Sequence, residues 1–165
     1  FLDQGGSILS WGKSTDLFMG VLKIKHSEET SEEFQLPIRD VSKQLTSAGL
    51  YCPGSLLKMQ LMEDHPLSLG MPKEIGVFTR GRPVFATSIP NFDMDRRVIG
   101  RYAKQEVLLN GYCEGQDQIS HKSAMVWLKK GKGQLVLYGF NPQFRASTQT
   151  SFKLLFNGIL LPDVE

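Results

Sequence analysis

Gly131-Lys-Gly-Gln-Leu-Val-Leu-Tyr-Gly-Phe-Asn-Pro-Gln-Phe-Arg-Ala-Ser-Thr-Gln-Thr-Ser-Phe-Lys-Leu-Leu-Phe-Asn-Gly-Ile-Leu160 is the stretch that decides the fold. It predicts a Gly-rich turn, a buried strand over 134–140, a polar loop and a helix capped by Ser147 or Thr148. In an open α/β sheet, ligand and catalytic groups commonly follow the carboxyl end of a strand. The loop Asn141–Arg145 is therefore the first candidate site. The apolar side chains of the following helix predict its core face: Phe152, Leu155, Phe156, Ile159 and Leu160.

The segments upstream extend this pattern into a mixed α/β domain. Residues 123–128 form a second apolar strand, and the Gly-rich turn 129–133 joins it to 134–140 as a hairpin. Alternating or short apolar runs predict further strands over 7–11, 56–62, 75–78, 83–87 and 98–102. We expect one helix to follow the cap Ser14-Thr-Asp16, with Leu17, Phe18, Val21 and Leu22 inward, and another to run from Pro37 to Gly49. The acidic segment 26–33 between them predicts a solvated loop.

The composition fits one globular domain and excludes several classes of protein. The chain has 165 residues and a net charge of only +2, and no stripe of Lys and Arg is interleaved with aromatic residues. Nucleic-acid binding is therefore not indicated. No apolar run approaches the roughly 20 residues of a membrane span. The chain opens without Met on Phe1-Leu-Asp-Gln-Gly5, which is typical of the end of a helix. We therefore expect 1–165 to be a single domain that is part of a longer protein.

Cys113 is the candidate nucleophile. Gly111-Tyr-Cys113-Glu-Gly115 has the form G-x-C-x-G, the nucleophile elbow of class I glutamine amidotransferases. That chemistry needs a strand-turn-helix setting, and the residues after Cys113 carry no helical apolar stripe. It also needs a His base, which in that class precedes a Glu after a late strand. The corresponding segment here is Asn141-Pro-Gln143, so an incidental cysteine in a turn is the competing interpretation.

Two further groups of residues could bind a metal or form a disulfide, and each also has a simpler structural interpretation. His26-Ser-Glu-Glu29 has the H-x-x-E spacing of zinc carboxypeptidases, with His121 as an imaginable third ligand, but an acidic solvated loop is the simpler interpretation. Cys52 and Cys113 fit no metal spacing and could pair as a disulfide in an oxidising compartment. No metal site is predicted in this chain.

Arg145 is the polar residue most suited to recognition. A guanidinium at the carboxyl edge of a sheet can bind a carboxylate through two parallel hydrogen bonds. The alternative is an Arg that satisfies carbonyls of its own loop. Asn141 and Gln143 would accompany it as ligand-binding or interface residues. The clusters 80–82 and 93–97 are expected to be salt-bridged or solvated rather than substrate clamps.

Together the segments resemble the C-terminal region of bacterial M14 (carboxypeptidase A-like) zinc carboxypeptidases. The matching segments run along nearly the whole chain: Phe1-Leu-Asp-Gln-Gly-Gly-Ser-Ile-Leu, Leu36-Pro-Ile-Arg-Asp-Val, Tyr51-Cys-Pro-Gly-Ser-Leu-Leu, His65-Pro-Leu, Gly70-Met-Pro and Gly139-Phe-Asn-Pro-Gln-Phe-Arg145. The resemblance implies the later part of a class I glutamine amidotransferase-like (flavodoxin-like) three-layer sandwich with a mixed sheet. It also implies an upstream peptidase domain that carries the zinc and hydrolyses peptides, and a periplasmic or secreted location.

Three functions remain open at this point. The first is a non-catalytic accessory domain that packs against its own upstream peptidase domain or binds a peptide or glycan. The second is a hydrolase that uses Cys113. The third is a small-ligand site centred on Arg145, Gln143 and Asn141.

Overall fold

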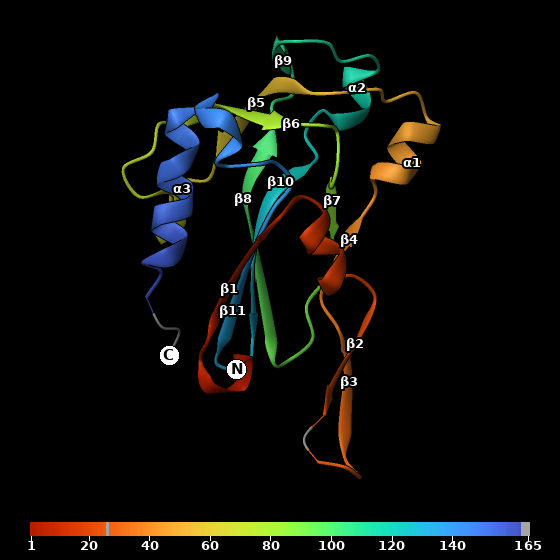
Figure 1. Cartoon of the computed structure of the whole chain (residues 1–165), viewed down its shortest axis with the longest axis vertical. Helices are drawn as coiled ribbons and strands as arrows, with labels where there is room; N and C mark the ends of the chain where they lie inside the picture. Colours follow the sequence, from red (N-terminus) through yellow and green to blue (C-terminus); the bar gives the residue numbers. More distant parts are fainter. Residues whose placement is uncertain (26, 163–165) are drawn as a thin grey trace.

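The protein is built around one large mixed sheet with few helices, as the computed structural model shows for residues 1–25 and 27–162 (Figure 1). The nine-stranded sheet has the main order β1-β11-β10-β8-β5-β6, while β4 pairs with β7, β7 with β10, and β9 with β5. Its strands are β1 (Ser7–Trp11), β4 (Ile38–Asp40), β5 (Ser55–Leu61), β6 (Glu74–Thr79), β7 (Phe85–Thr87), β8 (Met94–Tyr102), β9 (Leu108–Asn110), β10 (Ser123–Lys130) and β11 (Gly133–Tyr138). Only β1 and β11 run parallel; the other pairs are antiparallel. The predicted mixed α/β class is confirmed at this level.

The hairpin β10–β11 forms the centre of the core, as its sequence predicts. Its side chains alternate between two apolar clusters on opposite faces of the sheet: Val136 and Tyr138 lie in one cluster, and Leu135 and Leu137 in the other. Burial on both faces explains why these strands read as continuous apolar runs rather than alternating ones. Trp127 is buried here, and its indole N–H donates to Gln134 Oε1 at 2.8 Å.

The helical elements are short apart from the last. They are α1 (Ser42–Ser47), α2 (Gln116–Ile119), α3 (Gln149–Ile159) and the 3-10 turns η1 (Leu2–Gln4), η2 (Gly12–Phe18), η3 (Pro66–Ser68) and η4 (Phe144–Ala146). η1 ends at Gly5 in the left-handed conformation, as the sequence indicated. No helix in the described part of the chain is long and apolar enough to cross a membrane.

The predicted core face of α3 is wrong. The residues that α3 buries are Ser151, Leu154 and Gly158, whereas Phe156 and Ile159 are 59% and 64% exposed. The reason is the close approach of α3 to the sheet: a Cβ added to Gly158 would lie 2.7 Å from both Leu9 Cδ2 and the Tyr138 hydroxyl oxygen. Ser151, Leu154 and Gly158 therefore face the sheet. Of the predicted stripe, Phe152 and Leu155 are half-buried, whereas Phe156, Ile159 and Leu160 face outward.

The helix predicted after Ser14-Thr-Asp16 is also wrong, and so is the loop predicted over 26–33 in its later part. The chain instead forms the 3-10 helix η2 and then a two-stranded antiparallel hairpin, β2 (Val21–Lys25) with β3 (Ser31–Gln35), which projects from the body (Figure 1). Gly20 has a φ of 80°, which interrupts a helix at that point. Val21 then begins the strand.

The second helix starts later than predicted. Pro37 is followed by the short strand β4, and α1 begins only at Ser42. Asp40 marks the change from strand to helix, because its carboxylate accepts hydrogen bonds from Ser42 N at 2.8 Å and from Ser42 Oγ at 2.8 Å. It also accepts one from Val84 N at 3.0 Å, which ties the start of α1 to the segment before β7.

Candidate functional site

The loop after β11 lies beside the end of β1, because these two strands are parallel and end together. A Cβ added to Gly12 would lie 3.3 Å from Asn141 Oδ1. The Asn141 main-chain N–H donates to the Phe78 carbonyl oxygen at 3.0 Å. The ring of Phe144 stacks on the ring of Phe78, with centroids 3.9 Å apart and planes 4° apart. The loop is therefore held against β6 by one hydrogen bond and one ring stack.

Arg145 lies on this loop in the left-handed region, with φ 46°, and Ala146 follows with φ 51°. Its side chain is exposed, and the guanidinium carbon lies 5.4 Å from the centroid of the Phe144 ring. Within the described residues it forms no ion pair. Arg145 is thus an exposed cation without an ion-pair partner among the described residues, and it lies over the Phe144 ring, which stacking on Phe78 holds in place. Asn141 and Gln143 share the loop with it, but the three residues line none of the cavities described below.

Cys113 is half-buried beside a second thiol. Burial, reinforced by the neighbouring Cys52 thiol and its hydrogen bond, raises the pKa of Cys113 to about 12. The thiol therefore stays protonated near neutral pH, which is the reverse of what nucleophilic attack needs. A helical turn does follow: α2 begins after Gly115, whose φ is 65°, and spans only Gln116–Ile119.

The histidines occupy different surroundings. His121 is exposed, with its main-chain N–H donating to the Tyr102 carbonyl oxygen at 3.1 Å. His26, the first residue of the H-x-x-E pair, lies outside the described residues, so the structure does not test that pair. Among the residues that the structure describes, no three His, Cys, Asp or Glu side chains converge as metal ligands.

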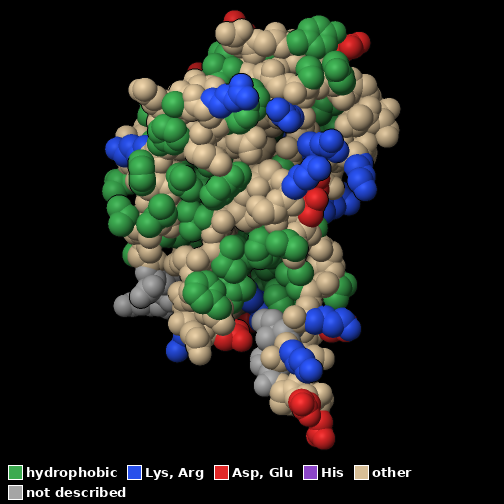
Figure 2. Space-filling view, viewed as in Figure 1, with side chains coloured by type: hydrophobic (Ala, Val, Ile, Leu, Met, Phe, Trp, Pro, Cys, Tyr) green, Lys and Arg blue, Asp and Glu red, His purple; other side chains and the backbone are tan. Residues whose placement is uncertain are grey.

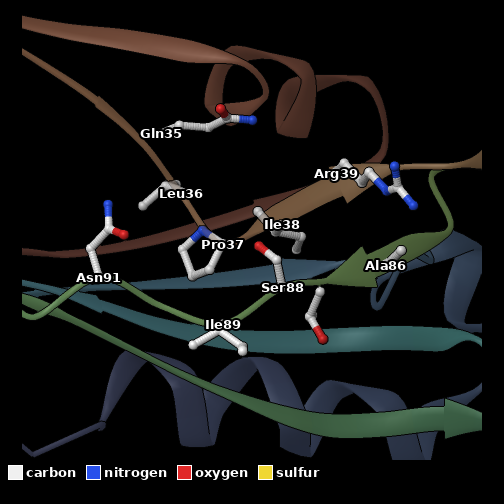
Figure 3. A pocket seen from close by; sticks show the side chains of 10 residues that line it. Gln35, Leu36, Pro37, Ile38, Arg39, Ala86, Ser88, Ile89 and Asn91 are labelled. Atoms are coloured by element: carbon white, nitrogen blue, oxygen red, sulfur yellow. The ribbon is translucent and has the colours of Figure 1, made fainter.

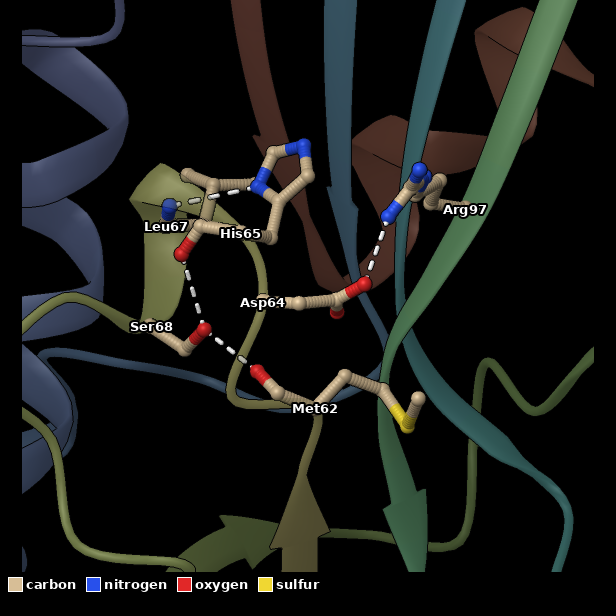
Figure 4. A network of polar contacts seen from close by, with 6 residues as sticks. All are labelled: Met62, Asp64, His65, Leu67, Ser68 and Arg97. Atoms are coloured by element: carbon tan, nitrogen blue, oxygen red, sulfur yellow. Dashed lines mark hydrogen bonds and ion pairs between the residues drawn. The ribbon is translucent and has the colours of Figure 1, made fainter.

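His65 belongs to a polar network at η3 (Figure 4). Its Nδ1 accepts a hydrogen bond from Leu67 N at 3.2 Å, and its ring centroid lies 5.3 Å from that of Trp127. Burial, together with the charge of Arg97, lowers the pKa of His65, although Asp64 opposes the change. The Ser68 hydroxyl donates to the carbonyl oxygens of Met62 and His65, so it is engaged in holding the turn. The network is structural.

The largest cavity described here has a volume of about 520 Å³ and lies where the chain enters β4 and leaves β7 (Figure 3). We call it the amide pocket, after the two amide side chains in its lining, which consists of Gln35, Leu36, Pro37, Ile38, Arg39, Ala86, Thr87, Ser88, Ile89 and Asn91. Leu36 and Ile38 are buried below it, while Ile89 is 88% exposed on its rim. Phe92, directly after Asn91, is fully exposed. No sequence pattern used above predicts this site; the signal for it was the apolar residues in the loop 89–92.

Comparison with known proteins assigns no family to the chain. No family model and no curated protein matches it. One solved structure with a similar chain path is that of a ThuA-like protein from Bacteroides uniformis, with a TM-score of 0.44 and 10% sequence identity. The match covers 96% of this chain and 59% of that one, so this chain spans about three-fifths of the other's length. At this similarity it carries no functional assignment.

Proposed function

We propose that this chain is a non-catalytic binding domain of the glutamine amidotransferase-like type, accessory to a zinc carboxypeptidase-like protein, and that it binds a neutral glycan in the amide pocket. The zinc and the peptide hydrolysis would belong to an upstream domain, and the protein would be periplasmic or secreted. The observation that carries the binding role is the lining of the amide pocket. Its volume of about 520 Å³ lies within the range of small-ligand sites.

The chemistry of the pocket favours a ligand rich in hydroxyl groups. Gln35 and Asn91 offer amide donors and acceptors, and Thr87 and Ser88 offer hydroxyls that act as either. None of these four groups is charged, and Arg39 is the one charged side chain in the lining, so most of the polar groups here suit hydroxyls better than an ion. The exposed ring of Phe92 lies next along the chain and supplies an apolar surface on which a sugar ring can rest.

The state of Cys113 supports a binding role over hydrolysis. A thiol with a pKa of about 12 is almost wholly protonated at neutral pH. If the domain does not use this thiol, iodoacetamide should label Cys113 slowly at pH 7. Rapid labelling, with an activity lost in Cys113→Ser, would favour the hydrolase instead.

The binding proposal is tested by titrating the ¹⁵N-labelled domain with chitotetraose and cellotetraose and following amide shifts. Shifts should concentrate at 35–39 and 86–92. Asn91→Ala and Phe92→Ala should each weaken binding by about tenfold, as the loss of one good hydrogen bond or ring contact predicts. Gln105→Ala removes an exposed amide elsewhere and should leave it unchanged. Shifts that appear only with peptides would contradict the glycan assignment, and robust zinc-dependent peptidase turnover by this chain would contradict the non-catalytic role.

The loop 141–145 supports a second candidate, a carboxylate-binding role for Arg145. Two consecutive non-glycine residues with positive φ are costly, and such backbone strain clusters at functional sites. The guanidinium over Phe144 is also positioned in advance of binding. Arg145→Gln should abolish binding of a peptide with a free C-terminal carboxylate but not of its amidated form, if this role holds. Equal binding of the two peptides would exclude it.

A further inference from the structure

A second pocket lies where β1 ends and α1 begins, and Arg145 is not among its lining residues. Its volume is about 390 Å³. It is formed by three segments that are far apart in the sequence, and its lining residues are Gly12, Lys13, Asp16, Met19, Arg39, Asp40, Ser42, Lys43, Arg82 and Pro83. We call it the cationic pocket, because four of these residues carry a positive charge.

The four cations form no ion pair with any residue that the structure describes. Lys13, Arg39, Lys43 and Arg82 form no ion pair and no side-chain hydrogen bond within the described residues. Their side chains are exposed. Figure 2 shows Lys and Arg side chains gathered around an acidic one on the side of the molecule where α1 and η2 lie. Cations that repel one another and form no ion pair create a local excess of positive potential, which an anion can neutralise.

The carboxylates in the lining only partly offset this charge. Asp40 accepts three hydrogen bonds, from Ser42 N, Ser42 Oγ and Val84 N, so its oxygens are already engaged in holding α1 to the segment before β7. Asp16 is exposed. Four cations against two carboxylates leave an excess of two positive charges among the lining residues.

We propose that the cationic pocket binds the phosphate group of a small phosphomonoester. A phosphomonoester carries between about 1.5 and 2 negative charges at pH 7, which matches the excess. The guanidinium forks of Arg39 and Arg82 fit phosphate oxygens through paired hydrogen bonds, and the ammonium groups of Lys13 and Lys43 add point charges. A pocket of about 390 Å³ also leaves room for the group that the phosphate is attached to. This site is separate from the amide pocket except for Arg39, which lines both.

The test uses the whole chain and two variants that spare Arg39. Wild type is titrated with glucose 6-phosphate, inorganic phosphate and glucose by calorimetry and by amide shifts. Glucose 6-phosphate should bind, with shifts at 12–16, 39–43 and 82–83, and glucose should not. The double variant Lys43→Gln/Arg82→Gln should weaken binding by at least tenfold, whereas Asp16→Asn should strengthen it several-fold. Lys73→Gln removes an exposed charge elsewhere and serves as the matched control.

Three results would overturn the proposal. Glucose could bind as tightly as glucose 6-phosphate, or the double variant could bind glucose 6-phosphate as tightly as wild type does. The third is that Lys73→Gln weakens binding as much as the double variant does. A final arm separates the sources of the phosphate. Vesicles with and without phosphatidylinositol 4-phosphate are sedimented with the protein. Co-sedimentation that depends on this lipid and is lost in the double variant would support the site and assign the phosphate to a lipid headgroup. Binding of glucose 6-phosphate without co-sedimentation would support it and assign a soluble ligand.

Discussion

Cys52 and Cys113 face each other across an isolated antiparallel bridge. The bridge joins Tyr51 to Glu114, and each main-chain N–H of this pair donates to the other's carbonyl oxygen, at 3.0 and 2.9 Å. The next residues in antiparallel register are Cys52 and Cys113, in a non-hydrogen-bonded position, where opposite Cα atoms lie about 4.5 Å apart. That separation falls within the range that a disulfide spans. Both cysteines are free thiols in this structure.

We therefore predict that a mild two-electron oxidant joins the two thiols, slowly at neutral pH and faster at alkaline pH, because exchange needs a thiolate and burial raises the pKa of Cys113 to about 12. Oxidised glutathione would take up the two electrons and protons, and the protein mass would fall by about 2 Da as the two thiol hydrogens leave. The bond closes a loop of roughly 60 residues and should stabilise the fold by about 4 kcal/mol on the chain-entropy estimate. Urea unfolding of oxidised and reduced protein measures this. Cys113→Ser is the control that must show no effect of oxidant, and unchanged mass in wild type would contradict the prediction.

Lys130 fixes the projecting hairpin to the sheet, and its partners matter more than the lysine itself. Its ammonium is nearly buried, forms ion pairs with Glu32 at 3.0 Å and with Asp93, and lies 5.1 Å from the Phe34 ring centroid. Burial lowers the pKa of Lys130, but the hydrogen bonds to Asp93 and Glu32 outweigh this and raise it. Removing the carboxylates would leave a buried cation without compensation, whereas removing the lysine leaves carboxylates that water can reach.

We therefore expect Glu32→Gln/Asp93→Asn to cost about 2–4 kcal/mol, and Lys130→Met only about 1 kcal/mol. Equilibrium urea unfolding at pH 7 compares the two variants. Lys23→Met, which removes an exposed ion pair with Glu33 within the same hairpin, should change the stability by less than about 1 kcal/mol. The reverse order of the two costs would show that the ammonium is solvated.

His65 should make the fold sensitive to mild acid. Burial, with the Arg97 charge, lowers the pKa of His65 below its ordinary 6.5 in the folded protein. As the pH falls, the unfolded chain takes up the proton first. The stability from neutral His65 is therefore complete above about pH 6.5 and is lost as the pH falls below that value toward the folded pKa.

The measurement is the unfolding free energy between pH 7.5 and 5. His65→Asn keeps a side-chain acceptor for Leu67 N and should remove most of the decrease between pH 6.5 and 5. His121→Asn, at an exposed site, should leave most of the decrease in unfolding free energy between pH 6.5 and 5 in place. Equal slopes in wild type and His65→Asn would rule out the assignment.

The outward face of α3 should tolerate polar substitutions. Phe156 and Ile159 are mostly exposed, so Phe156→Gln/Ile159→Gln should change the stability by less than about 1 kcal/mol. Leu154 is fully buried, and Leu154→Ala should cost about 2–5 kcal/mol. Thermal unfolding of the two variants decides between this arrangement and the one that the apolar stripe predicts. A large loss of stability in the double Gln variant would show that the apolar stripe, rather than the Leu154 side of α3, packs against the sheet.

The sequence predicted the centre of the sheet because local pattern and burial agree there. In β10 and β11, two apolar runs joined by a Gly-rich turn are compatible with one arrangement, an antiparallel hairpin that is buried on both faces. On α3 they disagree: the apolar residues follow helical spacing, but Gly158 alone permits the close approach to Leu9 and Tyr138. That approach is a property of two segments separated by nearly the whole chain, which no local pattern contains.

The candidate sites show the same limit. Arg145 was identified within a single loop, and the structure leaves it exposed on that loop. The amide pocket needs residues 35–39 beside 86–91, which only the pairing of β4 with β7 brings together. The cationic pocket needs three separated segments, and Arg82 was interpreted from its neighbours in sequence as part of a solvated cluster. Charges that meet through tertiary structure cannot be counted from sequence spacing.

The hairpin β2–β3 forms a two-stranded sheet of its own, while Leu22 and Phe34 pack against the body near its base. Such a unit can open without global unfolding. Its amide protons should therefore exchange with solvent in a gradient, fastest near 27–30 and slowest near Leu22 and Phe34. Gln35, the last residue of β3, and Leu36, which follows it, line the amide pocket. Each opening of the hairpin β2–β3 would then remove one wall of the amide pocket. The equilibrium between the closed and the open hairpin would therefore set the fraction of molecules able to hold a ligand there.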